Sequence, residues 1–146
     1  MNMKDERQFV GYSKYRSRLV DGHVHTELCP HGSGDRTAMM IEKAIELRIE
    51  KVCLTEHAPL PIAFAAEYGG DKKAYDTASL KLNEVDTYLE LGRQLQRAYG
   101  THIDISLGFE VDYIPGFESD IQEFLDRYGP LTDDNILSVH FMEGVN

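Results

Sequence analysis

Two histidines separated by one residue, His23 and His25, follow a short apolar run early in the sequence. Alternate side chains of an extended strand point to the same face, so the two imidazoles lie close enough to bind one metal ion. One structural histidine beside one exposed histidine is the alternative interpretation, because the pattern is short. The pair becomes a convincing metal site only if further ligands join it.

Four more residues with metal-binding side chains occupy comparable positions. His57, Glu110 and His140 each follow an apolar run typical of a strand, and His31 lies on a short loop that contains proline and glycine. Because the carboxyl ends of parallel strands meet at one face of an α/β fold, we expect these side chains to converge with the first two. Each residue alone has an ordinary alternative, a histidine bonded to backbone or a solvated carboxylate, but their shared position favours one cleft.

The expected cleft is rich in imidazole, which suits zinc, iron or manganese better than magnesium or calcium. Six ligands exceed the four of one tetrahedral centre, and the two oxygens of Glu110 are able to bridge neighbouring ions, so we expect more than one ion. Such ions polarise a phosphoryl oxygen and lower the pKa of a bound water, which makes hydrolysis of a phosphate ester the first chemistry to consider.

Other residues near the cleft have less defined roles. Glu56 and Asp112 flank the expected ligands and either orient them or contact a substrate ammonium, and Glu56 is our candidate for substrate binding; a solvated surface carboxylate is the alternative. His102 lies at the opposite end of its expected strand from Glu110, so we leave it out. The sequence contains no nucleophilic-serine elbow, Walker loop or dinucleotide glycine fingerprint, so the metals would have to supply the chemistry.

The elements that must position these residues follow from hydrophobic periodicity. Short apolar runs predict strands at 18–20, 52–55, 103–109 and 136–139. Amphipathic patterns predict helices at 37–49, 79–99 and 116–128. This β-α-β-α-β-α-β order predicts an α/β fold with parallel strands, either a small open sheet or part of a barrel. The long connection at 58–78 either covers an active site or is a disordered excursion.

Composition limits the class of protein. A chain of 146 residues with 42% apolar content fits one globular domain. The formal net charge of -10 repels phosphate backbones and argues against nucleic acid as a partner. Cys29 and Cys53 lack paired spacing and are expected to be small buried side chains. With no secretory signal and no membrane-spanning apolar stretch, the sequence predicts a cytoplasmic setting without membrane partners.

Two motifs make the chain resemble the polymerase and histidinol phosphatase (PHP) family. Residues 21–32 are similar to the opening of its histidinol-phosphatase branch, and residues 54–61 resemble the second motif of that branch. The resemblance runs over nearly the whole chain and implies a distorted, TIM-like β/α barrel with two to three divalent ions of zinc, manganese or iron. It also implies a ligand assignment, in which the first ion is bound by His23 and His25, Glu110 bridges to a second held by His140, and His31 and His57 serve a third.

The resemblance also implies an activity, the hydrolysis of L-histidinol phosphate to L-histidinol and phosphate in histidine biosynthesis. The substrate would be a small phosphomonoester. One alternative is another phosphoesterase of the family, such as a phosphotyrosine phosphatase or a 3′-to-5′ exonuclease; the acidic charge and the lack of a basic, aromatic-lined groove count against the exonuclease. The other alternative is a catalytically inactive, truncated metal-binding module.

One departure from the family pattern limits these expectations. The family takes further ligands from later strands, a histidine and an Asp-x-His pair, with basic residues that grip phosphate, and residues 1–146 have no counterpart. We therefore expect 1–146 to be a partial PHP domain that lacks the C-terminal strands of the barrel and has little or no activity alone. The unpaired fourth strand would form an edge prone to self-association unless something covers it.

Overall fold

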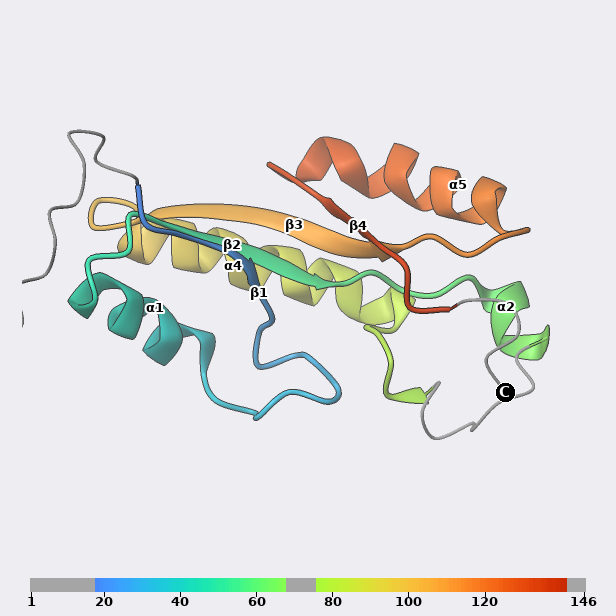
Figure 1. Ribbon diagram of the computed structural model, residues 1–146, viewed down its shortest axis with the longest axis horizontal. Coiled ribbons are helices and arrows are strands. Elements are labelled where there is room, and N and C mark those ends of the chain that lie inside the picture. The colour runs from blue at the N-terminus through green and yellow to red at the C-terminus, as the bar shows by residue number, and fades with distance from the viewer. Residues whose placement is uncertain (1–17, 68–75, 142–146) are drawn as a thin grey trace, which may run out of the picture.

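The computed structural model describes residues 18–67 and 76–141, which form a parallel four-stranded sheet flanked by helices (Figure 1). The strands lie in the order β1 (Val20–Val24), β2 (Lys51–His57), β3 (Asp104–Asp112) and β4 (Ile136–Ser138). The helices are α1 (Thr37–Glu46), α2 (Ile62–Glu67), α4 (Val85–Tyr99) and α5 (Glu118–Tyr128), with short 3-10 helices η1 (Leu82–Glu84) and η2 (Gly129–Leu131). The predicted order of strands and helices is confirmed, and α2 is an addition within the long connection after β2.

The two faces of the sheet differ in chemistry because side chains alternate along each strand. On one face, Leu54 and Phe109 are buried in a core completed by residues of α1, α4 and α5, among them Ile41 and Tyr88. On the other face, His57 of β2 lies in register with Glu110 of β3. The apolar face therefore holds the helices, and the polar face presents the candidate ligands.

Three strands extend further than the apolar runs indicate, whereas β4 ends at Ser138, one residue before the predicted end at 139. β2 continues to His57 and β3 continues to Asp112, whereas the predicted strands end at 55 and 109. The first strand begins at Val20 and includes His23, later than the predicted 18–20. The ladder is made by backbone groups, so a polar side chain that faces the concave side of the sheet does not end a strand.

The helices are shorter than their amphipathic patterns. α1 ends at Glu46 because Arg48 adopts a left-handed conformation with φ 60°, which lets the backbone N–H of Ile49 donate to the carbonyl of Ala44. The predicted helix at 79–99 begins only at residue 82, because Lys81 has an extended backbone with φ -85° and ψ 152°. α5 begins after the turn at Gly116, where φ is 89°.

The segment before β4 is attached to β3 by side-chain oxygens, which accept hydrogen bonds from β3 backbone N–H groups as the carbonyls of a neighbouring strand would. The backbone N–H of Leu107 donates to Asp133 Oδ2 at 2.9 Å, and that of Phe109 donates to Asn135 Oδ1 at 2.9 Å. The backbone N–H of Asp133 donates in turn to the carbonyl of Leu107 at 2.7 Å. Between these bonds the chain passes directly over Gly108, where a Cβ would lie 1.4 Å from the carbonyl oxygen of Asp134. This contact sets where β4 begins.

Both edges of the sheet carry exposed apolar side chains. On the β1 side, Leu19 and Val20 are 55% and 51% exposed, and on the β4 side, Leu137 and Val139 are 67% and 54% exposed. β1 pairs only with β2, and β4 only with β3, within the part of the chain that the structure describes. Apolar residues at an open strand edge are suited to pair with further strands. In the same described residues, no helix has the length and apolar character needed to span a membrane.

Candidate metal centre

Four histidines surround the carboxylate of Glu110 at the carboxyl ends of the strands. Glu110 Oε2 lies 2.8 Å from His23 Nε2, 3.3 Å from His25 Nε2 and 3.3 Å from His57 Nδ1. Its other oxygen, Oε1, lies 3.5 Å from His140 Nε2. Only 3% of Glu110 is exposed, so the carboxylate lies at the base of the cluster. The structure thus brings together five of the six residues that the sequence predicts as ligands.

His31, the sixth predicted ligand, borders the cluster. Its ring centroid lies 5.1 Å from that of His57 and 6.4 Å from that of His25. His31 Nδ1 lies 2.8 Å from the carbonyl oxygen of Thr77, an acceptor, so Nδ1 donates and Nε2 is left to face a ligand. Thr77 belongs to the long connection after β2, and this contact places the end of that connection at the site; residues 68–75 lie outside the described part of the chain.

Two buried carboxylates contact the rear nitrogens of the cluster histidines. His25 Nδ1 lies 3.1 Å from Glu56 Oε1, and His140 Nδ1 lies 2.7 Å from Asp112 Oδ1, which also accepts a bond from Ser138 Oγ at 3.2 Å. Glu56 is fully buried, so its position favours the orienting role over the contact with a substrate ammonium that we considered from the sequence. Asp112 is 7% exposed and contacts His140 in the same manner.

The electrostatic environment favours ionised carboxylates. Burial raises the pKa of Glu110, but the hydrogen bond from His23 and the electrostatic interactions with the surrounding imidazoles outweigh burial, so the pKa lies below its ordinary value. The pKa of Glu56 is also lowered, because hydrogen bonds from His25 and Thr26 outweigh its burial. Burial lowers the pKa of His57, against the opposing charge of Glu110. Deprotonated carboxylates and a neutral imidazole are the forms that bind a metal ion.

The donor atoms fit a divalent cation. Ligand atoms of a tetrahedral zinc ion with bonds of about 2.0–2.1 Å lie about 3.3 Å apart. His23 Nε2 and His25 Nε2 are 3.1 Å apart, and both are within 3.3 Å of Glu110 Oε2. His57 Nδ1 is buried and has no hydrogen-bond partner among the described residues. A second group of close donor atoms joins His57 with Asp112 and His140.

Cys29 forms a third group of close donor atoms, with His25 and Glu56. Both carboxylate oxygens of Glu56 already accept hydrogen bonds from the protein, which leaves this group less suited to an ion. Burial raises the pKa of the Cys29 thiol and of the Cys53 thiol, and both cysteines are free. Neutral, buried thiols agree with the structural role expected from their spacing.

Sequence reasoning missed two contributors to the site. Thr26 donates its backbone N–H and its hydroxyl to Glu56 Oε2, at 2.9 and 2.7 Å, and Thr77 holds His31 through a backbone carbonyl. Thr26 directly follows a predicted ligand, but a threonine in that place is too common to single out. Every residue has a backbone carbonyl, so the type of residue at position 77 could not reveal this contact.

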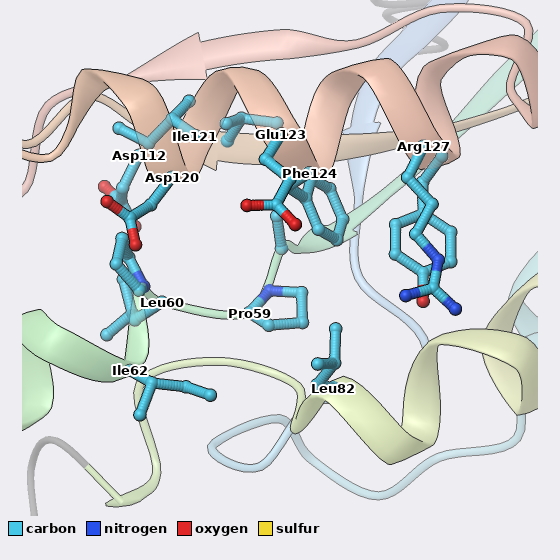
Figure 2. Close-up of a pocket in the computed structure, with 14 residues that line it drawn as sticks. Pro59, Leu60, Ile62, Leu82, Asp112, Asp120, Ile121, Glu123, Phe124 and Arg127 are labelled. Atoms are coloured by element: carbon cyan, nitrogen blue, oxygen red, sulfur yellow. The ribbon is translucent and has the colours of Figure 1, made fainter.

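A separate pocket of about 190 Å³ lies between α5 and the segment after β2 (Figure 2). Its lining is mainly apolar, with Pro59, Leu82 and Phe124 facing one another, and Arg127 at one end. None of the six predicted ligands lines it, although Asp112 does. The candidate chemistry therefore lies at the histidine cluster and not in this pocket.

Comparison with known families and curated proteins gives concordant results. The PHP domain family matches residues 21–145. Histidinol-phosphatase of Bacillus subtilis is 41% identical over 122 residues, which cover 84% of this chain and 44% of that protein. A probable histidinol-phosphatase of Deinococcus radiodurans is 27% identical over 124 residues, which cover 85% of this chain and 43% of that protein. The chain thus spans less than half the length of these relatives.

Two solved structures share the fold. A Listeria monocytogenes protein, provisionally assigned as a histidinol phosphatase, superposes with a TM-score of 0.84 at 44% identity, over 86% of this chain and 46% of that one. Histidinol phosphate phosphatase of Lactococcus lactis, solved with zinc, L-histidinol and phosphate, gives a TM-score of 0.65 at 27% identity, over 86% and 41%. The four parallel strands therefore form a curled half-barrel of a TIM-like β/α fold.

Proposed function

Since the chain belongs to the PHP domain family, we propose that the protein built on it is a metal-dependent phosphatase that hydrolyses L-histidinol phosphate to L-histidinol and phosphate. The observation that carries this proposal is the cluster of four histidines around Glu110. It lies at the carboxyl ends of the strands, where β/α folds build their active sites. The similarity to proteins named histidinol-phosphatase supports the choice of substrate.

The assignment of the ligands to separate ions follows the family resemblance. His23, His25 and Glu110 would hold one ion, and His140 would hold a second with the other oxygen of Glu110. His31 and His57 would serve a third ion. When bound, zinc, manganese or iron supplies a Lewis acid for the phosphoryl oxygen and a water of lowered pKa.

The side chains of this chain prepare the cleft for that chemistry. The carboxylate of Glu110 lies in the middle of the cluster, with Oε2 beside His23 and Oε1 beside His140, so it lies between the proposed first and second ion sites. The acceptors behind His25, His31 and His140 each contact Nδ1, and the Nε2 atoms of His25 and His140 lie beside Glu110. Cations bound by these rings would let the cleft receive an anion despite the net negative charge of the chain.

We further propose that residues 1–146 are part of the domain and that more chain completes the barrel. The exposed apolar residues at both sheet edges, such as Val20 and Leu137, are the expected contacts for the remaining strands. Residues 1–146 alone would then have little or no turnover and would associate through these edges. The free, buried cysteines support a reducing, cytoplasmic setting.

The test is phosphate release from L-histidinol phosphate, measured with malachite green on the longest natural protein that contains this chain. Zinc, manganese or iron is restored to separate samples, and phosphotyrosine and p-nitrophenyl phosphate serve as competing substrates. We expect release from L-histidinol phosphate to exceed release from the others. Equal turnover of all three, or none, would contradict the assignment, and faster turnover of phosphotyrosine would replace it with the alternative phosphatase.

The partial-domain proposal has its own test. Light scattering of residues 1–146 should show self-association, and a Leu137→Lys/Val139→Lys double variant should reduce it, because charge at an edge strand blocks pairing. Met39 on α1 is also exposed, at 58%, so Met39→Lys is the matched control away from both edges. A monomeric wild-type chain, or equal effects of the edge and control variants, would argue against open edges.

A further inference from the structure

Glu56 approaches the cluster from the side of the sheet that faces the helices. Along β2 its side chain shares a face with Val52 and Leu54, whereas His57 points to the opposite face. Even so, the Glu56 carboxylate reaches the end of β1 and contacts His25 from behind. It is 0% exposed, so it cannot contact a substrate in the cleft.

The hydrogen bonds around Glu56 use both of its oxygens as acceptors. Oε2 accepts from the backbone N–H of Thr26 at 2.9 Å and from the Thr26 hydroxyl at 2.7 Å. Oε1 accepts from the backbone N–H of His57 at 3.1 Å and lies 3.1 Å from His25 Nδ1. Backbone N–H groups only donate, so a carboxylate is the form of Glu56 that satisfies these contacts, and His25 Nδ1 then carries a proton.

A proton on His25 Nδ1 fixes what the other ring nitrogen does. A neutral imidazole has one N–H and one lone pair, so Nε2 is left with the lone pair. That nitrogen faces His23 Nε2 at 3.1 Å and Glu110 Oε2 at 3.3 Å, the two other donors of the proposed first ion. Carboxylates behind metal-binding histidines are known to fix both ring orientation and tautomer.

We propose that Glu56 is a positioning residue that holds His25 in its Nδ1–H tautomer and aims Nε2 at the ion shared with His23 and Glu110. Thr26 assists by clamping the carboxylate from the adjacent backbone. The inference rests on the metal centre of the proposed function but is independent of the substrate. If the protein binds zinc but has no phosphatase activity, the proposed function fails and the role of Glu56 does not. If a Glu56 variant binds zinc normally, the role of Glu56 fails and the proposed function does not.

The first readout is the tautomer of His25 in the metal-free chain, from long-range ¹H–¹⁵N NMR correlations. At a pH at which the His25 ring is neutral, we expect a protonated Nδ1 and an unprotonated Nε2 in the wild type. We expect loss of this preference in Glu56→Gln, because the amide NH₂ group would face another hydrogen-bond donor. Glu27→Gln is the control, since Glu27 is a neighbouring carboxylate that accepts from the Thr37 backbone and contacts no histidine. A wild-type His25 protonated at Nε2 would overturn the proposal.

The second readout is zinc affinity, measured by competition with a chromophoric chelator. Loss of a carboxylate that orients a ligand lowers metal affinity by about 10- to 100-fold, which is the fall expected for Glu56→Gln and not for Glu27→Gln. If Glu56→Gln fails to fold, Thr26→Val, which removes one bond to Glu56, should lower affinity by a smaller factor, and Thr26→Ser should restore it. Wild-type affinity in Thr26→Val and Glu56→Gln, or a wild-type chain that binds no zinc, would overturn the proposal.

Discussion

Gly108 offers a quantitative test of how the chain reaches His140. In a Gly108→Ala variant the new Cβ would lie 1.4 Å from the carbonyl oxygen of Asp134, whereas ordinary van der Waals contacts begin at 3.4 Å. The opposing atom is backbone, so no side chain can rotate away. The segment at 133–135 would have to retreat by about 2 Å to restore normal contact.

That retreat breaks the bonds that attach the segment to β3. The short ones are the two bonds from the backbone N–H groups of Leu107 and Phe109 and the bond from the backbone N–H of Asp133, all between 2.7 and 2.9 Å. At about 1 kcal/mol net for each bond, the free energy of unfolding should fall by about 3 kcal/mol. This agrees with the usual cost of overpacking, about 1–3 kcal/mol.

The assay is urea unfolding of the metal-free chain followed by circular dichroism. Gly22→Ala is the matched control, because a Cβ on Gly22 in β1 would meet no atom within 4 Å, and its effect should be below about 0.5 kcal/mol. A Gly108→Ala variant as stable as the wild type would refute the packing of 133–135 against β3. It would also remove the basis for placing His140 beside Glu110.

Three further predictions follow from the site and the core. Glu110→Gln should abolish high-affinity zinc binding, measured by equilibrium dialysis with elemental analysis, because one oxygen faces three histidine nitrogens; unchanged stoichiometry would contradict the cluster. Tyr88→Phe should lower the free energy of unfolding in urea by about 1–3 kcal/mol, because the Tyr88 hydroxyl donates to the Gly108 carbonyl at 2.6 Å and accepts from the backbone N–H of Glu56. In the control Tyr99→Phe, which removes an exposed bond to Glu42, the decrease should be below about 0.5 kcal/mol. Because the pKa of Glu56 is lowered on folding, its ionised form stabilises the fold above pH 4.5, and this stabilisation is lost as the pH falls through the folded pKa. Because the pKa of His25 is raised on folding, its protonated form stabilises the fold below pH 6.5, and this stabilisation is lost as the pH rises through the folded pKa. The stability difference between metal-free wild type and Glu56→Gln should therefore be largest between pH 4.5 and 6.5 and should decrease as the pH rises above 6.5; a difference that increases above pH 6.5 would contradict the pairing.

The order of elements was predictable because it depends on hydrophobic periodicity, which the core enforces. Strand ends were not, since backbone pairing continues through polar residues such as His57 and Glu110 when they face the concave side of the sheet. Helix ends also depend on local dihedral angles, and Arg48 at φ 60° carries no reliable signal in residue type. The ends of helices and strands therefore depend on backbone geometry, which cannot be predicted from the pattern of side chains.

The convergence of the candidate site could be predicted for a general reason, because the carboxyl ends of parallel strands share one face. The role of Glu56 could not, since alternation places it on the opposite face of β2 from His57. It reaches His25 only because the end of β1 passes beside the end of β2, where Val24 lies in register with Leu54. Such contacts depend on register between strands, which one sequence does not specify.

The most direct test of the metal centre is a zinc-soaked crystal of the chain measured at the zinc absorption edge. We predict an anomalous peak within about 2.0–2.2 Å of His23 Nε2, His25 Nε2 and a carboxylate oxygen of Glu110. A second peak between Glu110 and His140 would support the bridging role of the carboxylate. Zinc bound only elsewhere on the chain, with these side chains left without a peak, would contradict the account.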